Sequence, residues 1–189
     1  MIQTDMKLDA KGLACPMPVV KTKKIMQELA PGKVLEVEAT DKGSIADIKA
    51  WAESVGHQYI GVHEEDGVIT HYLRKTTGEE AEEKRFPHVV SNEELQEALA
   101  ADEDVQIIDV RESAEYAFGH IPGAISAPFG ELEAIMNSLD KEMSLYVICR
   151  TGNRSDMAAQ KLADAGFRNV KNVVPGMSGW NGSSQKSMN

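Results

Sequence analysis

The sequence is poor in the residues that build metal sites and disulfide frameworks. Its 189 residues include only two cysteines, Cys15 and Cys149, which form no Cys-x-x-Cys pair, and five histidines without zinc-ligand spacing. A disulfide between the two cysteines is one alternative, but cytosolic thiols are held reduced, so we expect both to be free. The sequence therefore implies no metal and no organic cofactor.

Long apolar runs and a surplus of basic residues are also missing. No stretch approaches the roughly 18 consecutive apolar residues that a membrane span needs, and the first residues lack the pattern of a secretory signal. We therefore expect a cytoplasmic protein that does not contact membranes. The net charge of −10 argues against a nucleic-acid partner. With 42% hydrophobic residues, the composition is that of a globular protein.

The first 75 residues have the pattern of an α/β unit. Apolar residues recur with helical spacing in two segments and alternate with polar residues in others. The expected elements are a strand at 4–9, a helix at about 16–29, a strand at 35–39, a helix at about 44–55, and strands at 59–63 and 68–73. Ser44 is expected to cap the second helix, and Asp66-Gly67 to form the turn between the last two strands.

A strongly charged segment at 76–85 is expected to be an exposed linker between this unit, residues 1–75, and a second domain, residues 86–189. In the second domain Ser91 and Glu94 form a capping box ahead of a helix. The other expected elements are apolar strands at 105–110, 145–149 and 170–174, and a helix at about 154–165. Strands that alternate with helices predict a parallel sheet with right-handed crossovers.

Cys149 stands where parallel α/β sheets bind their ligands. It ends a buried strand, and the residues Arg150-Thr151-Gly152-Asn153-Arg154-Ser155 lead directly into a helix. A tight loop of this kind turns N–H groups inward, and the helix N-terminus adds about half a positive charge. With two flanking arginines, we expect the pKa of Cys149 to lie below its free value of about 8.5. The alternative, an inert buried cysteine, fits poorly beside two arginines.

Several motifs of this domain occur together in a known family. Residues 149–155 (CRTGNRS) resemble the active-site loop of single-domain rhodaneses, and the family's D-V-R-E and G-H-I-P-G-A motifs match residues 109–112 and 119–124. Residues 174–180 (VPGMSGW) are similar to its glycine-rich C-terminal segment, although Met177 stands where a second glycine is usual. The resemblance covers roughly residues 86–182 and implies a rhodanese-like fold, with helices on both faces of the parallel sheet.

This resemblance implies a double displacement on Cys149. The thiolate would take the sulfane sulfur of thiosulfate or a persulfide, hold it as a persulfide, and pass it to a thiol acceptor. Arg150 and Arg154 would bind the anionic part of the donor, and the amides of residues 150–155 would bind the persulfide.

Three further residues near these motifs need a separate interpretation. Asp109 could accept loop N–H groups or pair with an arginine, and we favour a structural ion pair at the end of a strand, with Arg111 as a second supporting residue. His120 could serve as a base, but we favour a turn residue that is hydrogen-bonded to the backbone.

Two other functions stay open for this domain. Cysteine-dependent phosphatases and arsenate reductases of similar fold have five residues between cysteine and arginine, whereas four separate Cys149 from Arg154. A shorter loop suits one sulfur atom better than a phosphate. The other alternative is a persulfide carrier or regulatory module without enzymatic activity, although both cysteines and both loop arginines are present.

Cys15 is the second candidate nucleophile. It precedes Pro16 at the expected start of the first helix, where the helix dipole should lower the pKa of its thiol. The alternative is a buried cysteine beside a solvated face of lysines. The segment 12–21 (GLACPMPVVK) resembles the TusA/SirA family of sulfur carriers, which is marked by C-P-x-P at the start of the first helix.

The match to these carriers extends over residues 4–75 and implies a two-layer βαβαββ sandwich in which Cys15 carries persulfide sulfur between proteins. Partner proteins would dock with the help of Lys21, Lys23 and Lys24. A linker of about ten residues spans on the order of 17–19 Å, and such a tether gives millimolar effective concentrations. The sequence thus predicts a sulfurtransferase whose partners are a thiosulfate or persulfide donor and other thiol-bearing or sulfur-carrier proteins, with sulfur relayed between Cys149 and Cys15.

Overall fold

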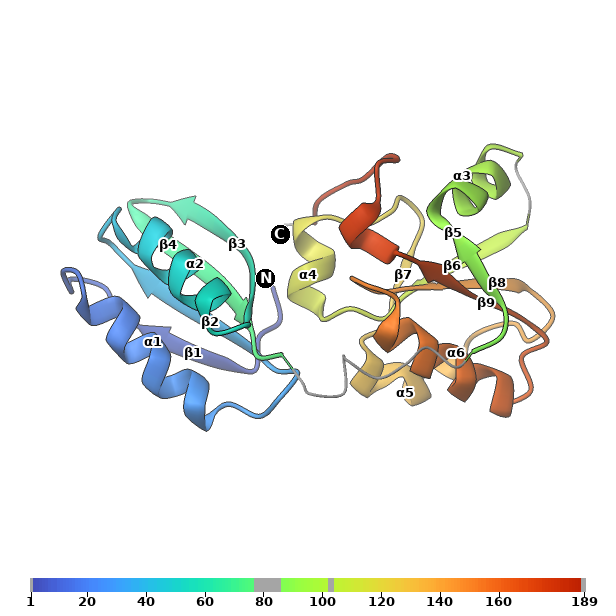
Figure 1. Cartoon of the computed structure of the whole chain (residues 1–189), viewed down its shortest axis with the longest axis horizontal. Helices are drawn as coiled ribbons and strands as arrows, with labels where there is room; N and C mark the ends of the chain where they lie inside the picture. The colour runs from blue at the N-terminus through green and yellow to red at the C-terminus, as the bar shows by residue number, and fades with distance from the viewer. Residues whose placement is uncertain (1, 77–85, 102–103, 188–189) are drawn as a thin grey trace. The chain divides into compact units, whose positions relative to one another are not determined.

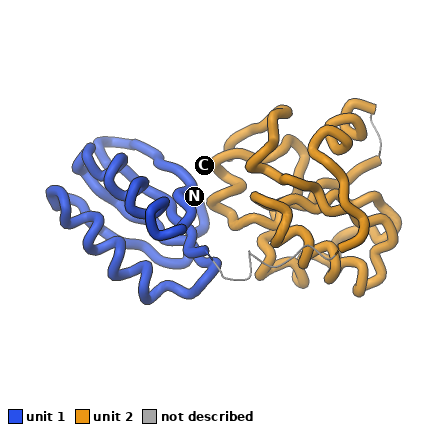
Figure 2. The backbone as a smooth tube through the Cα atoms, viewed as in Figure 1, with its two compact units in different colours: residues 1–78, 189 blue, residues 79–188 orange. Residues whose placement is uncertain are grey.

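The computed structural model describes residues 2–76, 86–101 and 104–187. They belong to two units, one ending at residue 78 and the other beginning at residue 79 (Figure 2). Nearly all of the expected linker, 76–85, lies outside the described residues, so the boundaries at 75 and 86 stay predictions. In the part of the chain that is described, no helix has the length and apolar character to cross a membrane.

The N-terminal unit has the predicted order of strands and helices. Its elements are β1 (Met6–Asp9), α1 (Met17–Glu28), β2 (Val34–Ala39), α2 (Ser44–Ser54), β3 (Gln58–Glu65) and β4 (Val68–Arg74). The strand order in the sheet is β1-β2-β4-β3, with β1 parallel to β2 and the other pairs antiparallel. Both helices lie on one face of this sheet (Figure 1). The predicted two-layer βαβαββ sandwich is confirmed.

Burial of apolar side chains between the two layers holds this unit together. Leu35 and Val37 of β2 and Leu73 of β4 are fully buried and form one cluster with Met26 of α1 and Ile48 of α2. Each such side chain contributes about 1.5–3 kcal/mol when it is removed from water. The β3–β4 turn is also as expected, since Asp66 and Gly67 both have positive φ, 51° and 78°.

The predicted cap of α2 is wrong. Gly43 is the N-cap, and the side chain of Ser44 makes no capping bond. Its hydroxyl instead lies 3.0 Å from Nε2 of His71, whose Nδ1 lies 2.9 Å from the Tyr59 hydroxyl. His71 is fully buried, and desolvation lowers its pKa to about 4, so the ring is neutral and needs both partners. The Ser44 hydroxyl therefore contacts the buried His71 of β4 and does not cap α2.

The C-terminal unit is built around a parallel sheet. Its elements are β5 (Val89–Ser91), α3 (Asn92–Ala100), β6 (Val105–Asp109), α4 (Ser113–Phe118), β7 (Ile125–Ser126), α5 (Leu132–Met136), β8 (Ser144–Ile148), α6 (Asn153–Asp164) and β9 (Asn169–Val174). The strand order is β5-β9-β8-β6-β7, and every pair is parallel. The sequence predicted the longer elements but not β5, β7, α4 and α5, which are too short to show a period.

Helices cover both faces of this sheet, as the resemblance implied (Figure 1). Leu145 and Val147 of β8 pack in a cluster with residues of α5 and α6. Tyr146 and Ile148, which alternate with them, pack in a second cluster with residues of α3. Burial on both sides is the reason why these strands are apolar throughout rather than alternating.

The order of the strands creates a position for a ligand between β6 and β8. The chain leaves β6 toward β7 on one side of the sheet, and it leaves β8 toward β9 on the other side. Neighbouring strands whose connections diverge in this way leave a crevice at their carboxyl ends. Asp109 ends β6 and Cys149 directly follows β8, so both lie at this crevice.

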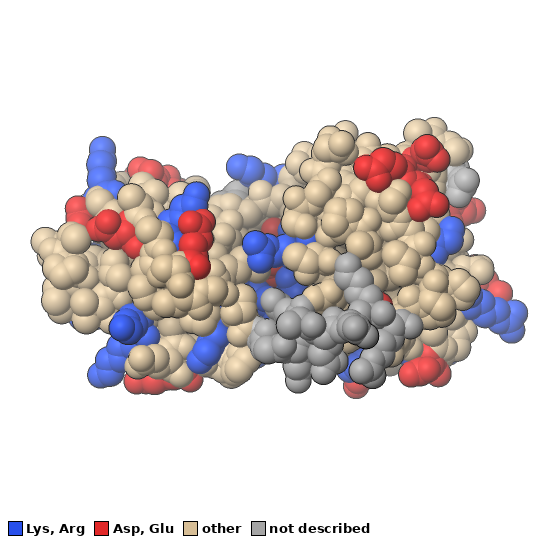
Figure 3. Space-filling view, in the orientation of Figure 1, with Lys and Arg blue, Asp and Glu red and all other residues tan. Residues whose placement is uncertain are grey.

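Charged side chains of both signs are spread over the described surface. On the face shown in Figure 3, lysine and arginine occur together with aspartate and glutamate on each unit. This mixture, with the net charge of −10, gives the surface no dominant positive field on that face.

Candidate functional site

The sulfur of Cys149 lies inside the turn between β8 and α6. Gly152, with φ 93°, reverses the chain and is the N-cap of α6, and its N–H donates to Cys149 Sγ at 3.1 Å. The hydroxyl of Ser155, in the first turn of α6, lies 3.3 Å from the same sulfur. Cys149 is only 1% exposed, although Arg150 and Thr151 at the rim of the turn are exposed. The sulfur therefore forms the floor of a polar turn and does not lie on the surface.

The turn is clamped by the segment that follows β9. The N–H groups of Met177 and Ser178 donate to the carbonyl oxygens of Cys149 and Arg150 at 2.8 and 2.9 Å. Gly176 has φ +79°, and a Cβ there would lie 2.4 Å from the Cys149 carbonyl oxygen. Met177 has no positive φ, which explains why a side chain is tolerated where a second glycine is usual.

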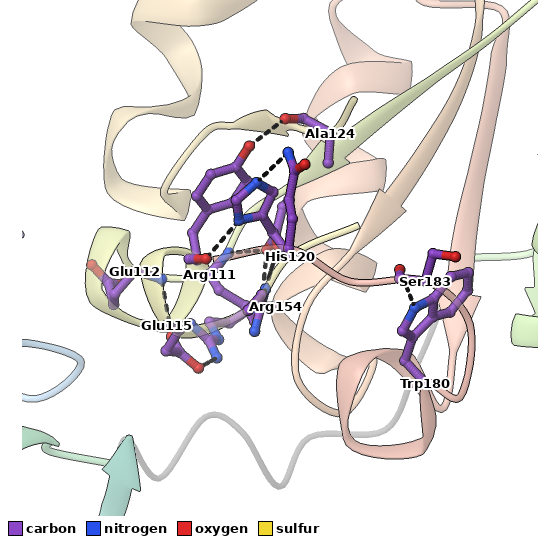
Figure 4. A network of polar contacts seen from close by, with 12 residues as sticks. Arg111, Glu112, Glu115, His120, Ala124, Arg154, Trp180 and Ser183 are labelled. Atoms are coloured by element: carbon purple, nitrogen blue, oxygen red, sulfur yellow. Dashed lines mark hydrogen bonds and ion pairs between the residues drawn. The ribbon is translucent and has the colours of Figure 1, made fainter. Parts of the chain in front are cut away.

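Arg154 has a different environment from the one we expected. Its two terminal nitrogens donate to the carboxylate of Glu115 on α4 at 2.7 and 2.9 Å, and both side chains are nearly fully buried (Figure 4). Such a bidentate pair fixes the start of α6 against α4. The sequence did not indicate this pair with Glu115, and donor binding by Arg154 stays a prediction. The side chain of Arg150, in contrast, is exposed.

Asp109 and Arg111 form the ion pair that we favoured. Arg111 Nη2 donates to Asp109 Oδ2 at 2.6 Å, and its Nε donates to Oδ1 at 2.9 Å. Arg111 also binds the carbonyl oxygen of Gly119 at 2.7 Å. Asp109 is fully buried, so the pair ties the end of β6 to the turn that contains Gly119.

His120 is held in that turn by the backbone, as we expected. Its Nδ1 lies 2.8 Å from the Tyr116 carbonyl oxygen, and its ring stacks on the Tyr116 ring with 3.6 Å between centroids. The Tyr116 hydroxyl donates to the Ala124 carbonyl oxygen at 2.6 Å (Figure 4). Gln185 covers the remaining ring nitrogen at 3.0 Å. These contacts give His120 a structural role.

Two residues that surround the loop were missed from the sequence. Asn172 of β9 is fully buried, and it contacts Ser155, Gly152 and Asp156. A polar residue within an apolar strand is a signal that could have indicated it. Glu115 gave no comparable signal, since its partner lies 39 residues further along the chain.

Cys15 lies just outside α1, one residue before the N-cap Pro16. It is exposed, which excludes the alternative of a buried cysteine. Its thiol donates to Asp47 Oδ2 at 3.1 Å, and its N–H donates to Asp41 Oδ2 at 3.2 Å. The hydrogen bond to the Asp47 carboxylate raises the pKa of the Cys15 thiol, with burial and the charges of both aspartates adding to the effect. The expected lowering by the helix dipole is therefore wrong.

The exposed face of α1 next to Cys15 combines cations with apolar side chains. Lys21, Lys23 and Lys24 are exposed as expected. Met17 is 44% and Val20 is 51% exposed. Both cysteines of the chain are free, and within the described ranges no three histidine, cysteine or acidic side chains gather in a way that could hold a metal ion.

Comparison with known proteins assigns both units. Residues 6–75 match the family model described as sulfurtransferase TusA, and residues 91–183 match that of the rhodanese-like domain. The putative sulfur carrier protein YrkF of Bacillus subtilis (strain 168) is 46% identical over 185 residues, which are 98% of this chain and 100% of that protein. The sulfur carrier protein TusA of Allochromatium vinosum is 38% identical over 76 residues, 40% of this chain and all of that protein.

A solved structure supports the assignment of the second unit. The rhodanese-like domain of the Alr3790 protein from Anabaena sp. is 26% identical, with a TM-score of 0.50 over 53% of this chain and 80% of that one. The motifs around Cys15 and Cys149, the two folds and the match to YrkF over almost the whole chain agree. The chain belongs to the family of sulfur carrier proteins in which a TusA domain precedes a rhodanese-like domain.

Proposed function

We propose that the C-terminal unit transfers sulfane sulfur through a persulfide on Cys149. The observation that carries this proposal is the position of the sulfur in the turn before a twelve-residue helix, 3.1 Å from the nitrogen of the Gly152 N–H group. An inward N–H group and a helix N-terminus both favour negative charge. A thiolate, or a persulfide anion that extends from it, is the charge that such a turn stabilises.

The proposed reaction has two steps. The Cys149 thiolate attacks the outer sulfur of thiosulfate, a new S–S bond forms, and sulfite leaves with the electron pair of the broken S–S bond. An acceptor thiolate then attacks the outer sulfur of the protonated persulfide, and Cys149 leaves as a thiolate. With a persulfide donor the leaving group of the first step is a thiolate instead of sulfite.

Residues 150–155 are proposed to receive the donor and the transferred sulfur. Arg150 is exposed, so its guanidinium can meet an anionic donor, and the amides of Thr151, Gly152 and Asn153 lie in the same turn. Because Cys149 is 1% exposed, neighbouring groups must move before a donor can reach its sulfur.

Three residues of the proposed site also make positioning contacts. Arg154 fixes the start of α6 through its pair with Glu115. Asp109 and Arg111 fix the end of β6, which pairs with β8 and leads to the same crevice.

We further propose that sulfur passes between Cys149 and Cys15 on the same chain. Cys15 is exposed, so a persulfide formed there is open to thiol-bearing partner proteins. Asp47 accepts the hydrogen bond of the thiol and can take the proton when Cys15 attacks. Partners would meet the exposed lysines of α1, which are Lys21, Lys23 and Lys24.

A thiosulfate:cyanide assay on the full chain tests the enzymatic step. We expect turnover with the wild type and none with Cys149→Ala. The matched control, Cys15→Ala, should keep its turnover, because cyanide takes sulfur directly from Cys149. Turnover by Cys149→Ala would refute the assignment of the nucleophile. A persulfide that forms on Cys149 without turnover would instead favour the alternative, a carrier or regulatory module without enzymatic activity.

The relay has its own test. After incubation with thiosulfate, mass spectrometry of the peptide that contains Cys15 should show the gain of one sulfur atom in the wild type and not in Cys149→Ser. Equal loading of Cys15 in both proteins would refute the relay and leave the assignment of Cys149 untouched.

A further inference from the structure

A chain of buried hydrogen bonds connects the Cys149 sulfur to strand β9. Ser155 Oγ lies 3.3 Å from Cys149 Sγ and 2.6 Å from Asn172 Oδ1. Ser155 and Asn172 are both fully buried, so water does not compete for these contacts. A serine hydroxyl has one proton, and it can donate that proton to only one of its two neighbours.

The orientation of the Asn172 amide decides whether the Ser155 hydroxyl donates to Asn172 or to the Cys149 sulfur. Its Nδ2 faces two acceptors, the Gly152 carbonyl oxygen at 3.1 Å and Asp156 Oδ1 at 3.4 Å. Phe86 N–H donates to the same Asp156 oxygen at 3.0 Å, which confirms it as an acceptor. The amide oxygen therefore faces Ser155. An amide oxygen carries no proton, so a separation of 2.6 Å requires the hydroxyl proton between the two oxygens.

When the Ser155 hydroxyl donates its hydrogen bond to Asn172 Oδ1, it presents only lone pairs to the Cys149 sulfur. These can accept a hydrogen bond from a thiol, but they face a thiolate unfavourably. For the hydroxyl to donate to a thiolate it must turn away from Asn172, and the buried amide oxygen then has no donor. A persulfide removes this conflict, because its charge lies on the outer sulfur and Sγ itself is uncharged.

We propose that Asn172 is a positioning residue that holds the Ser155 proton away from the Cys149 sulfur and thereby disfavours the bare thiolate relative to the persulfide. The inference rests on the proposed function, since it concerns the same sulfur. It adds a reason why this turn keeps a transferred sulfur: loading Cys149 restores the bond between Ser155 and Asn172.

Other charged groups lie around the loop, and the test variants leave all of them in place. They are Arg150 in the loop, Arg154 and Asp156 on α6, Glu115 on α4, and Asp109 with Arg111 at the end of β6.

The experiment is a mutant cycle on the full chain carrying Cys15→Ala, with iodoacetamide alkylation of Cys149 followed against pH. Asn172→Ala frees the Ser155 hydroxyl to donate to the thiolate, and we expect the midpoint of alkylation to fall by about one pH unit. The double variant Ser155→Ala/Asn172→Ala should have the same midpoint of alkylation as Ser155→Ala alone, because no hydroxyl is left for Asn172 to orient.

The matched control is Asn169→Ala, an exposed asparagine on the same strand, which should alkylate as the wild type does. An equal shift by Asn172→Ala with and without Ser155 would overturn the proposal, because it would reflect only a loosened loop. An unchanged midpoint with Ser155 present would overturn it as well. Asn172→Leu keeps the branch at Cγ without an acceptor and replaces Asn172→Ala if that variant does not fold.

Alkylation needs no sulfur donor, so the two proposals can fail separately. Coupling between the two substitutions in a chain that accepts sulfur neither from thiosulfate nor from a persulfide would refute the proposed function alone. Sulfur transfer without such coupling would refute only the role of Asn172.

Discussion

Gly176 is the position at which a single methyl group should disturb the Cys149 loop most directly. A Cβ at Gly176 would lie 2.4 Å from the Cys149 carbonyl oxygen and 3.1 Å from that of Arg150, and real Cβ contacts essentially never fall below 3.0 Å. The loop and the Gly176 segment must therefore separate by at least ~0.6 Å. This movement acts on the hydrogen bond from Met177 N–H to the Cys149 carbonyl oxygen.

Two costs add up in Gly176→Ala. The left-handed backbone, φ +79°, costs a residue with a Cβ about 1–2 kcal/mol, and forced overpacking costs about 1–3 kcal/mol. We therefore expect the free energy of unfolding of the C-terminal unit to fall by about 2–5 kcal/mol. Because a misplacement of about 1 Å can cost about a hundredfold in rate, persulfide formation on Cys149 should slow by about ten- to a hundredfold.

Gly123→Ala separates the two costs. Gly123 has φ +82° and belongs to the same unit, but nothing lies within 4 Å of its Cβ position. It should lose only the backbone contribution of about 1–2 kcal/mol and keep its rate. Denaturant unfolding and mass spectrometry of persulfide formation, both on Cys15→Ala chains, measure the two effects. Equal stability and equal rate in Gly123→Ala and Gly176→Ala would refute the argument that the clash with the loop matters.

Three other predictions follow from charged and titratable groups. Asp47→Asn should lower the pKa of the Cys15 thiol, since it removes the carboxylate that raises it, and alkylation against pH measures this. Burial lowers the pKa of His71 from 6.5 to about 4, so its contribution to stability is complete above pH 6.5 and about 3 kcal/mol is lost as the pH falls to 4; hydrogen exchange of β2 and β4 measures this loss. Glu115→Ala leaves Arg154 buried without its partner carboxylate and should cost about 3–5 kcal/mol in denaturant unfolding.

The first two of these predictions have an internal control, and all three have an outcome that would contradict them. Glu53→Gln, an exposed acid further along α2, should leave the alkylation of Cys15 unchanged, and an equal shift there would contradict the role of Asp47. Exchange in β6 and β8, corrected for the intrinsic effect of pH, is the reference for the His71 prediction; equal acid sensitivity of all four strands would contradict it. For the buried pair, an unfolding free energy within 1 kcal/mol of the wild type would contradict the value that we expect from the general cost of a broken buried pair, about 3–5 kcal/mol.

The sequence predicted well those features that depend on neighbours in the chain. The Ser91–Glu94 capping box and the Asp66-Gly67 turn formed as expected, because each involves residues no more than three positions apart. The long helices and strands followed from the period of their apolar residues. The cap at Ser44 failed for the opposite reason, since its hydroxyl is bound by His71, 27 residues further along the chain.

The charge environment of both cysteines likewise depends on contacts between residues that are far apart in the sequence. From the sequence, we expect Arg150, Arg154, the loop N–H groups and the dipole of α6 to act on Cys149, and the dipole of α1 to act on Cys15. In the folded chain Arg154 is bound by Glu115, and the hydrogen bond to Asp47 raises the pKa of the Cys15 thiol. The importance of Asn172 follows only from its contacts with Ser155 and Gly152 in the folded chain.

By itself the sequence determined the two folds, the motifs and the place of each cysteine at the start of a helix. The reason is that the period of apolar residues, turn residues and capping boxes all involve residues that are close together in the chain. Only the tertiary structure decided which groups touch each sulfur. Hydrogen bonds and ion pairs depend on separations of about 3 Å between side chains, and residues from distant segments reach such separations only after packing has brought their strands and helices together.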